Sequence, residues 1–140
     1  VRLYAAIANG GTLVQPHILS KITNSQGETV RTFNPENEQK LSIQPAIIST
    51  LRTALQDVVV RGTAKDKGLD IYKIAGKTGT AETGRHKDNH AWFVGYAPYD
   101  NPRYCFVVLV EHTSGHGGDI AGPIARELAS YLFPEINHAL

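Results

Sequence analysis

Two strand-like runs joined by a short turn constrain the fold of this chain more than any other feature. The run from Ala91 to Ala97 is rich in aromatic residues and stops at Pro98, and the run from Tyr104 to Glu111 is rich in β-branched residues. Asn101-Pro102 supplies the turn between them. Because so short a connection pairs neighbouring strands antiparallel, the sequence predicts a mostly antiparallel sheet.

Three segments with helical spacing flank these strands. The first runs from Leu3 to Ala8 and stops at Asn9-Gly10-Gly11, a typical helix end. The second begins at Pro45 and should end before Gly62, with an apolar face of Ile47, Ile48, Leu51, Leu55, Val58 and Val59. The last covers Ile120 to Leu132, with a buried stripe of Ile124, Leu128, Ala129 and Leu132. We therefore expect an α+β fold, with helices packed on a mostly antiparallel sheet.

The remaining segments are shorter. Two strands are expected within Leu13 to Phe33, around the turn cluster Asn24-Ser25-Gln26-Gly27, and residues 35–40 are expected to form a surface loop. A further strand is expected from Ile71 to Ala75, continuing into Gly76-Lys77-Thr78-Gly79-Thr80.

Composition excludes several classes of protein. The chain has 140 residues, and 14 Lys and Arg against 13 Asp and Glu leave a formal charge of +1. Nucleic-acid binders need a strong basic excess, so no nucleic-acid partner is expected. The single cysteine, Cys105, excludes an internal disulfide and a Cys-rich zinc module. The longest apolar run, Cys105 to Val110, is far shorter than a bilayer span, so no membrane contact is expected from this chain.

Gly76-Lys77-Thr78-Gly79-Thr80 is the densest cluster of functional residue types. A phosphate-binding P-loop would need a glycine at position 71, which is Ile. The cluster suits an acidic, extended ligand instead. Lys77 carries a positive charge, Thr78 and Thr80 carry hydroxyls that can donate to a carboxylate, and Gly79 lets a ligand approach the backbone.

Strand geometry adds a condition to this hypothesis. A regular strand places Lys77 and Thr78 on opposite faces. A ligand that uses both must therefore lie along the strand edge, where a peptide can add as another strand, or else Gly79 must twist the strand. The structural alternative is a Lys/Thr strand that leads into a glycine turn and binds nothing.

The stretch resembles the lysine-threonine-glycine box of serine penicillin-binding proteins and β-lactamases. Further motifs resemble class B penicillin-binding proteins, in the family's order and at about its spacing. They are Ala8-Asn9-Gly10-Gly11-Thr12-Leu13-Val14 with Pro16, Asp57-Val58-Val59 with Gly62-Thr63-Ala64, Gly76 to Glu82, and His90 to Pro98. Val110-Glu111-His112, Gly117-Gly118 and Ala121-Gly122-Pro123 favour the elongation (cell-shape) type over the division type.

The resemblance implies a D,D-transpeptidase that cross-links peptidoglycan stem peptides through a serine acyl-enzyme and binds β-lactams. It implies an electrostatic and proton-network role for Lys77, donor-carboxylate binding by Thr78 and Thr80, and an oxyanion donor in the Thr80 backbone N–H, worth roughly 3 kcal/mol. It implies no cofactor. It also implies other cell-wall synthesis proteins as partners, and a parent protein anchored in the bacterial inner membrane with this domain outside that membrane.

The chain departs from the family in its nucleophile. No serine here has a lysine three residues later, and Ser-x-Asn is also missing. Both elements precede the Lys-Thr-Gly box in the family. We therefore expect residues 1–140 to be the C-terminal third to half of a single transpeptidase domain, inactive alone and prone to self-association. The alternative is a non-catalytic module that binds acidic peptides, β-lactams or a cell-wall partner.

Two other features allow competing interpretations. His86 and His90 are four residues apart, as are His112 and His116, but both pairs lie in loop-like sequence, so we expect no metal site. Trp92 is a candidate apolar wall beside the substrate. Because Trp92 and Phe93 point to opposite faces of a strand, we expect at least one of them in the core.

Overall fold

The computed structural model describes residues 1–34, 38–84 and 88–137. Its helices are α1 (Arg2–Ala8), α2 (Pro45–Val60), α3 (Gly117–Leu132) and α4 (Pro134–Asn137), with a 3-10 turn, η1 (Asp70–Tyr72). Its strands are β1 (Thr12–Leu13), β2 (Lys21–Thr23), β3 (Thr29–Thr32), β4 (Gln39–Lys40), β5 (Ala75–Ala81), β6 (Asn89–Ala97) and β7 (Tyr104–Thr113). The strands pair antiparallel throughout. The predicted α+β fold with an antiparallel sheet is confirmed.

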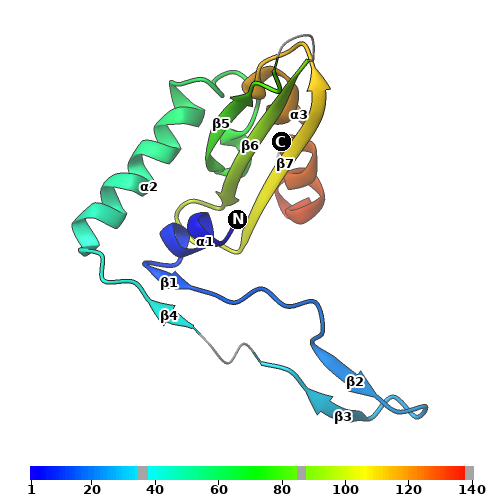
Figure 1. Cartoon of the computed structure of the whole chain (residues 1–140). Coiled ribbons are helices and arrows are strands. Elements are labelled where there is room, and N and C mark those ends of the chain that lie inside the picture. The colour runs from blue at the N-terminus through cyan, green and yellow to red at the C-terminus, as the bar shows by residue number, and fades with distance from the viewer. Residues whose placement is uncertain (35–37, 85–87, 138–140) are drawn as a thin grey trace.

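The main sheet has the order β5-β6-β7, with α3 packed on one face (Figure 1). On that face Phe93 is fully buried, in one cluster with Ala121, Ala125 and Ala129 of α3. Burying such an aromatic side chain contributes about 2–3 kcal/mol. On the other face Tyr96 and Ala75 pack against Ala8 of α1. The sheet is thus covered by α3 on one face and only in part by α1 on the other, where Val107 and Leu109 stay exposed, and α2 packs against β5.

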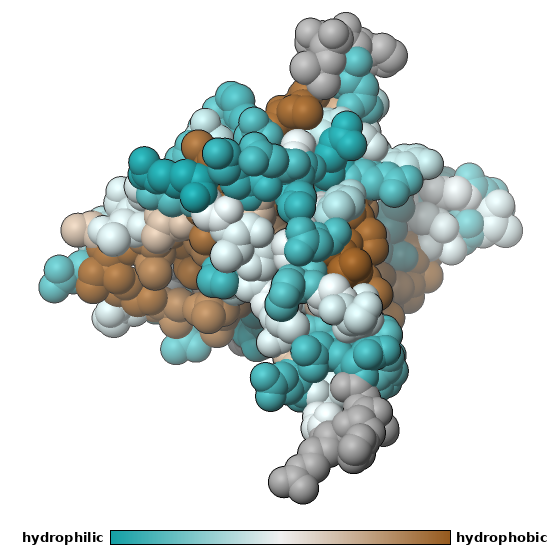
Figure 2. Space-filling view, turned by 90° about the horizontal axis from the view of Figure 1, so that it is seen from above, coloured by the Kyte–Doolittle hydropathy of each residue, from teal (hydrophilic) through white to brown (hydrophobic). Residues whose placement is uncertain are grey.

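Residues 14–34 and 38–43, between α1 and α2, form an extended arm. Figure 1 shows the β2–β3 hairpin at its far end, away from the main sheet. Every residue of β2 and β3 is exposed, including Ile22 and Val30. Apolar side chains therefore reach solvent in the arm, and the molecular surface shows hydrophobic patches between polar ones (Figure 2).

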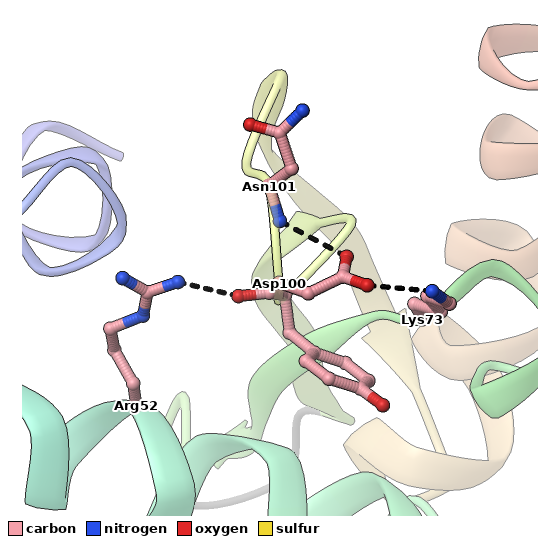
Figure 3. Close-up of polar contacts among 5 residues, drawn as sticks. Arg52, Lys73, Asp100 and Asn101 are labelled. Atoms are coloured by element: carbon pink, nitrogen blue, oxygen red, sulfur yellow. Dashed lines mark hydrogen bonds and ion pairs between the residues drawn. The ribbon is translucent and has the colours of Figure 1, made fainter.

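The turn between β6 and β7 is held by polar contacts with two other segments (Figure 3). Lys73 Nζ lies 2.6 Å from Asp100 Oδ2, and the Arg52 guanidinium donates to the Tyr99 carbonyl at 2.6 Å. The hydrogen bond from Lys73 lowers the pKa of the Asp100 carboxyl. These contacts hold the turn between β6 and β7 against α2 and against the residues that precede β5.

Several predicted boundaries need correction. Residues Gln39–Lys40 form β4 and pair with β1, because Leu13 and Thr12 offer them a backbone partner, whereas a loop was expected; residues 35–37 lie outside the described residues. The strand expected from Ile71 begins only at Ala75. Residues 70–72 form η1, and Lys73 has a φ of 51°, which a strand does not allow.

The helix boundaries are close to those predicted, but the buried faces differ. In α2 only Ile48 and Val59 are buried, and Ile47 and Leu51 are exposed. In α3 the fully buried apolar stripe is Ala121, Ala125 and Ala129, while Ile124 is 43% exposed. Small residues lie inward here because α3 packs close to the sheet, and the larger side chains are left at the margin of the contact.

Candidate functional site

The Lys-Thr-Gly-Thr cluster lies on β5, which is an edge strand of the three-stranded sheet described here. The pairing with β6 is continuous from Ala75 opposite Tyr96 to Ala81 opposite His90. On an edge strand, alternate N–H and C=O groups point away from the partner strand. Where α2 does not pack against it, the side of β5 that faces away from β6, called the free edge below, therefore offers backbone donors and acceptors to an extended ligand.

The register places the charged and hydroxyl groups on different faces, as predicted. Lys77 lies opposite Val94, whereas Thr78 lies opposite Phe93 on the face covered by α3. Thr80 shares the face of Thr78, because strand residues alternate. The lysine and the two threonines thus flank the same free edge from opposite sides.

Lys77 is exposed, and its Nζ donates to the Thr78 carbonyl at 2.8 Å. This contact stays within the strand and joins Lys77 to no acidic side chain. The ammonium therefore keeps its charge facing solvent beside the free edge, where an anionic ligand would meet it.

Each threonine hydroxyl is contacted from a segment distant in sequence. The Thr78 hydroxyl lies 2.6 Å from the hydroxyl of Thr63, which follows α2. The Thr80 hydroxyl accepts a hydrogen bond of 3.2 Å from the backbone N–H of Gly117, the first residue of α3. Three segments therefore meet at the motif: β5, the residues after α2 and the N-terminus of α3.

Two glycines of α3, Gly117 and Gly118, allow these three segments to pack closely. A Cβ added at Gly117 would overlap the Gly79 carbonyl oxygen and would lie 2.9 Å from the Gly79 nitrogen. A Cβ at Gly118 would overlap the Thr63 carbonyl oxygen. Real Cβ atoms do not approach other atoms so closely, so the first turn of α3 can reach the motif only without side chains at these two positions. Through Gly117, α3 approaches the Gly79 backbone from the face that Thr78 occupies. Ligand access at Gly79 remains a prediction.

Trp92 lies directly opposite Gly79 in the sheet, and a Cβ at Gly79 would come 3.3 Å from the Trp92 Cβ. Trp92 is half-buried, while Phe93 is completely buried on the other face. The prediction that at least one of the two lies in the core is confirmed. Gly79 leaves the indole uncovered on the Lys77 side of the strand.

The histidines that lie side by side in the structure are not the pairs that are four residues apart in the sequence. His90 and His112 are neighbours, with ring centroids 4.8 Å apart, and the His112 N–H donates to His90 Nδ1 at 3.1 Å. His116 is the N-cap of α3, and His86 lies outside the described residues. Across the described residues no three His, Cys, Asp or Glu side chains gather in a way that could hold a metal ion.

Comparison with known proteins places this geometry in a family. Residues 1–130 match the model of the penicillin binding protein transpeptidase domain, so the chain belongs to that family. It is 34% identical over 129 residues to the peptidoglycan D,D-transpeptidase PbpA of Mycolicibacterium smegmatis, covering 87% of this chain and 26% of PbpA. It is 32% identical over 145 residues to the stage V sporulation protein D of Bacillus subtilis, covering 97% of this chain and 22% of that protein.

Solved structures agree with this assignment. The D,D-transpeptidase domain of a peptidoglycan glycosyltransferase from Eggerthella lenta matches with a TM-score of 0.78 and 29% identity, over 99% of this chain and 32% of that one. The ceftriaxone acyl-enzyme complex of penicillin-binding protein A from M. tuberculosis matches with a TM-score of 0.72 and 28% identity, over 91% of this chain and 30% of that one. The chain thus spans about a quarter of the length of the curated relatives it matches.

No helix among residues 1–34, 38–84 and 88–137 has both the length and the apolar character needed to cross a bilayer.

The structure adds two residues to the site for which the sequence predicts no role, Thr63 and Gly117. Both belong to motifs noted in the sequence, Gly62-Thr63-Ala64 and Gly117-Gly118. Their contact with β5 depends on the packing of distant segments, for which the sequence holds no periodic signal.

Proposed function

We propose that the full-length protein is a peptidoglycan D,D-transpeptidase that works through a serine acyl-enzyme and binds β-lactams. We propose further that residues 1–140 are the C-terminal portion of its single transpeptidase domain. The observation that carries this proposal is the placement of Lys77, Thr78 and Thr80 around a free strand edge. The family assignment and the names of the relatives support it.

In the proposed reaction, a serine hydroxyl attacks the carbonyl carbon between the two terminal D-alanines of a donor stem peptide. The peptide bond breaks, D-alanine leaves with a proton on its amine, and an ester to the serine remains. An amine of a second stem peptide then attacks the ester carbonyl, the ester bond to the serine breaks as the cross-linking amide forms, and a proton from that amine restores the serine hydroxyl. A β-lactam acylates the same serine by opening its ring.

This chain supplies one wall of that site. Lys77 lies on one side of the free edge and provides positive charge and proton-network support near the serine. Thr78 and Thr80 bind the donor carboxylate from the other side, and the Thr80 backbone N–H is one of two oxyanion donors. Gly79 admits the ligand to the strand, and Trp92 provides an apolar surface next to it.

The nucleophile must come from outside these 140 residues, because no serine here has a lysine three residues later. A serine without a neighbouring base is a poor nucleophile at neutral pH. The chain alone is therefore inactive in the proposal. We also propose that the full-length protein is anchored in the inner membrane with this domain outside it, that it acts with other cell-wall synthesis proteins, and that it belongs to the elongation type.

Intact-mass spectrometry after incubation with excess benzylpenicillin tests the proposal. We expect no mass gain for the 140-residue chain, and a stoichiometric gain for the full-length protein at a serine of a Ser-x-x-Lys sequence. A gain at one serine of the isolated chain would contradict the placement of the nucleophile. No gain in the full-length protein would favour a non-catalytic module that binds acidic peptides, β-lactams or a cell-wall partner.

A further inference from the structure

Each of the two threonine hydroxyls of the motif, Thr78 and Thr80, is contacted by a hydrogen-bonding group from outside β5. A hydroxyl has one proton to donate and two lone pairs that accept. The Gly117 N–H can only donate, so at Thr80 it occupies a lone pair and leaves the Thr80 proton free. The hydroxyl of Thr63 occupies the corresponding position at Thr78, 2.6 Å away.

We propose that Thr63 is a positioning residue that donates its proton to Thr78, so that the Thr78 proton is free to donate to a ligand carboxylate. This inference rests on the proposed function and adds a residue to its site. In the ligand-bound state the hydrogen bonds run in one direction, from Thr63 to Thr78 and from Thr78 to the carboxylate. Hydrogen bonds arranged in such a chain polarise and strengthen one another.

The backbone around Thr63 is fixed, which suits a positioning role. Ala64 is 1% exposed, and its N–H donates to the Val58 carbonyl at 3.0 Å. The Thr63 carbonyl oxygen occupies the space that a side chain at Gly118 would need. Lys67 and Asp119 join the same loop to α3 through an ion pair of 2.7 Å. The backbone that carries Thr63 is thus held by both α2 and α3, while the Thr63 hydroxyl lies 2.6 Å from that of Thr78 and the residue remains exposed to solvent.

The test measures acylation of the full-length protein by benzylpenicillin, which carries a carboxylate, and by its methyl ester, which does not. Thr63→Val and Thr63→Ala remove the hydroxyl, and Thr63→Ser keeps it. Thr50→Val is the matched control, because the Thr50 hydroxyl donates to the Ala46 carbonyl within α2, away from the motif. The thermal midpoint of every variant is recorded alongside.

We expect Thr63→Val and Thr63→Ala to lower the acylation rate with benzylpenicillin about tenfold, the size of one hydrogen bond to a charged group. The rate with the methyl ester should change less than twofold, and Thr63→Ser should restore the benzylpenicillin rate to within about twofold of wild type. A purely structural role would lower both rates together.

An unchanged benzylpenicillin rate in Thr63→Val and Thr63→Ala would overturn the inference while leaving the proposed function intact. An equal loss with both probes would also overturn it. A wild-type protein that benzylpenicillin does not acylate would overturn the proposed function itself, and this inference with it. If Thr63→Val lowers the thermal midpoint, the smaller Thr63→Ala and the comparison of the two probes still decide the question.

Discussion

The motif on β5 and the arm at β2–β3 are both pairs of antiparallel strands, but their surroundings are opposite. Behind β5, the contacts of Gly117 and Gly118 leave no room for a single added carbon. In the arm every strand residue is exposed, and a Cβ at Gly27 would meet nothing within 4 Å. The same type of secondary structure is therefore sterically constrained in one region and almost unconstrained in the other, and substitutions should have effects that differ accordingly.

The largest difference is expected between two lysines. Lys77→Ala in the full-length protein should lower benzylpenicillin acylation about a hundredfold, the scale of one electrostatic group in an acyl-transfer site. Folding should be nearly intact, because Lys77 is exposed and its Nζ donates to a carbonyl of its own strand. Lys21→Ala in β2 is the control and should leave the rate unchanged. Acylation kinetics with thermal midpoints measure both, and an unchanged rate for Lys77→Ala would remove that residue from the site.

Next in size is a pair of glycine substitutions. Gly117→Ala should destabilise the chain by about 2–3 kcal/mol, because the new methyl group forces α3 away from Gly79. Gly27→Ala adds strain at a φ of 82°, but only within the hairpin. Since every residue of β2 and β3 is exposed, we expect the arm to open without the main sheet, and the midpoint of the main urea transition should barely move. Equal midpoint shifts for the two variants would show that arm and sheet unfold as one unit.

A moderate effect is expected on association. The isolated chain should associate as its concentration rises, because the exposed apolar side chains and free strand edges of the arm can pair between copies. The double variant Ile22→Thr, Val30→Thr should reduce this association and leave the main sheet intact, since both residues lie on the exposed hairpin. Size-exclusion chromatography with light scattering measures it. A wild-type chain that stays monomeric at every concentration would contradict the prediction.

The smallest expected effect is on the loss of thermal stability at low pH. The hydrogen bond from Lys67 lowers the pKa of Asp119, so this pair stabilises the fold above the ordinary carboxyl pKa and loses its effect as pH falls through the lowered value. Asp119→Asn should therefore show a slightly smaller drop in thermal midpoint between pH 7 and pH 3 than wild type. Lys67→Met should reduce the drop equally. A drop as large as wild type in both variants would mean that the pair does not stabilise the fold.

The sequence predicted the sheet well because its signal is local. The runs at Ala91–Ala97 and Tyr104–Glu111, with a short turn between them, allow almost only a hairpin, and the structure has one. The edge geometry of Lys77 and Thr78 followed from strand alternation alone. The sequence did not predict which residues of α3 are buried. Ile124 and Ala125 fit helical periodicity equally well, and the close packing of α3 on β6 buries Ala125 rather than Ile124.

The part of the site that the sequence predicted is also the part with a local signal. Lys77, Thr78, Gly79 and Thr80 are consecutive, so one motif indicates them all, although their roles remain predictions. Thr63 and Gly117 reach Thr78 and Thr80 across 15 and 37 residues of sequence. Such contacts depend on how three segments pack, and no local pattern in a single sequence encodes that. The elongation type also stays a prediction, since the relatives include both an FtsI homolog and MrdA.

The turn at the tip of the arm has a practical consequence for experiments on this protein. Asn24 is central to that turn, because its Oδ1 accepts from the backbone N–H groups of Gln26 and Glu28 at 3.0 and 2.9 Å and its amide donates to the Glu28 carboxylate at 2.8 Å. The tip lies at the far end of the molecule from β5 (Figure 1). A fluorescent dye attached to Ser25→Cys, in a protein that also carries Cys105→Ala, would therefore report on the motion and encounters of the arm without touching the strand edge. The tip of the arm is therefore a suitable labelling site for experiments that must leave β5 unmodified.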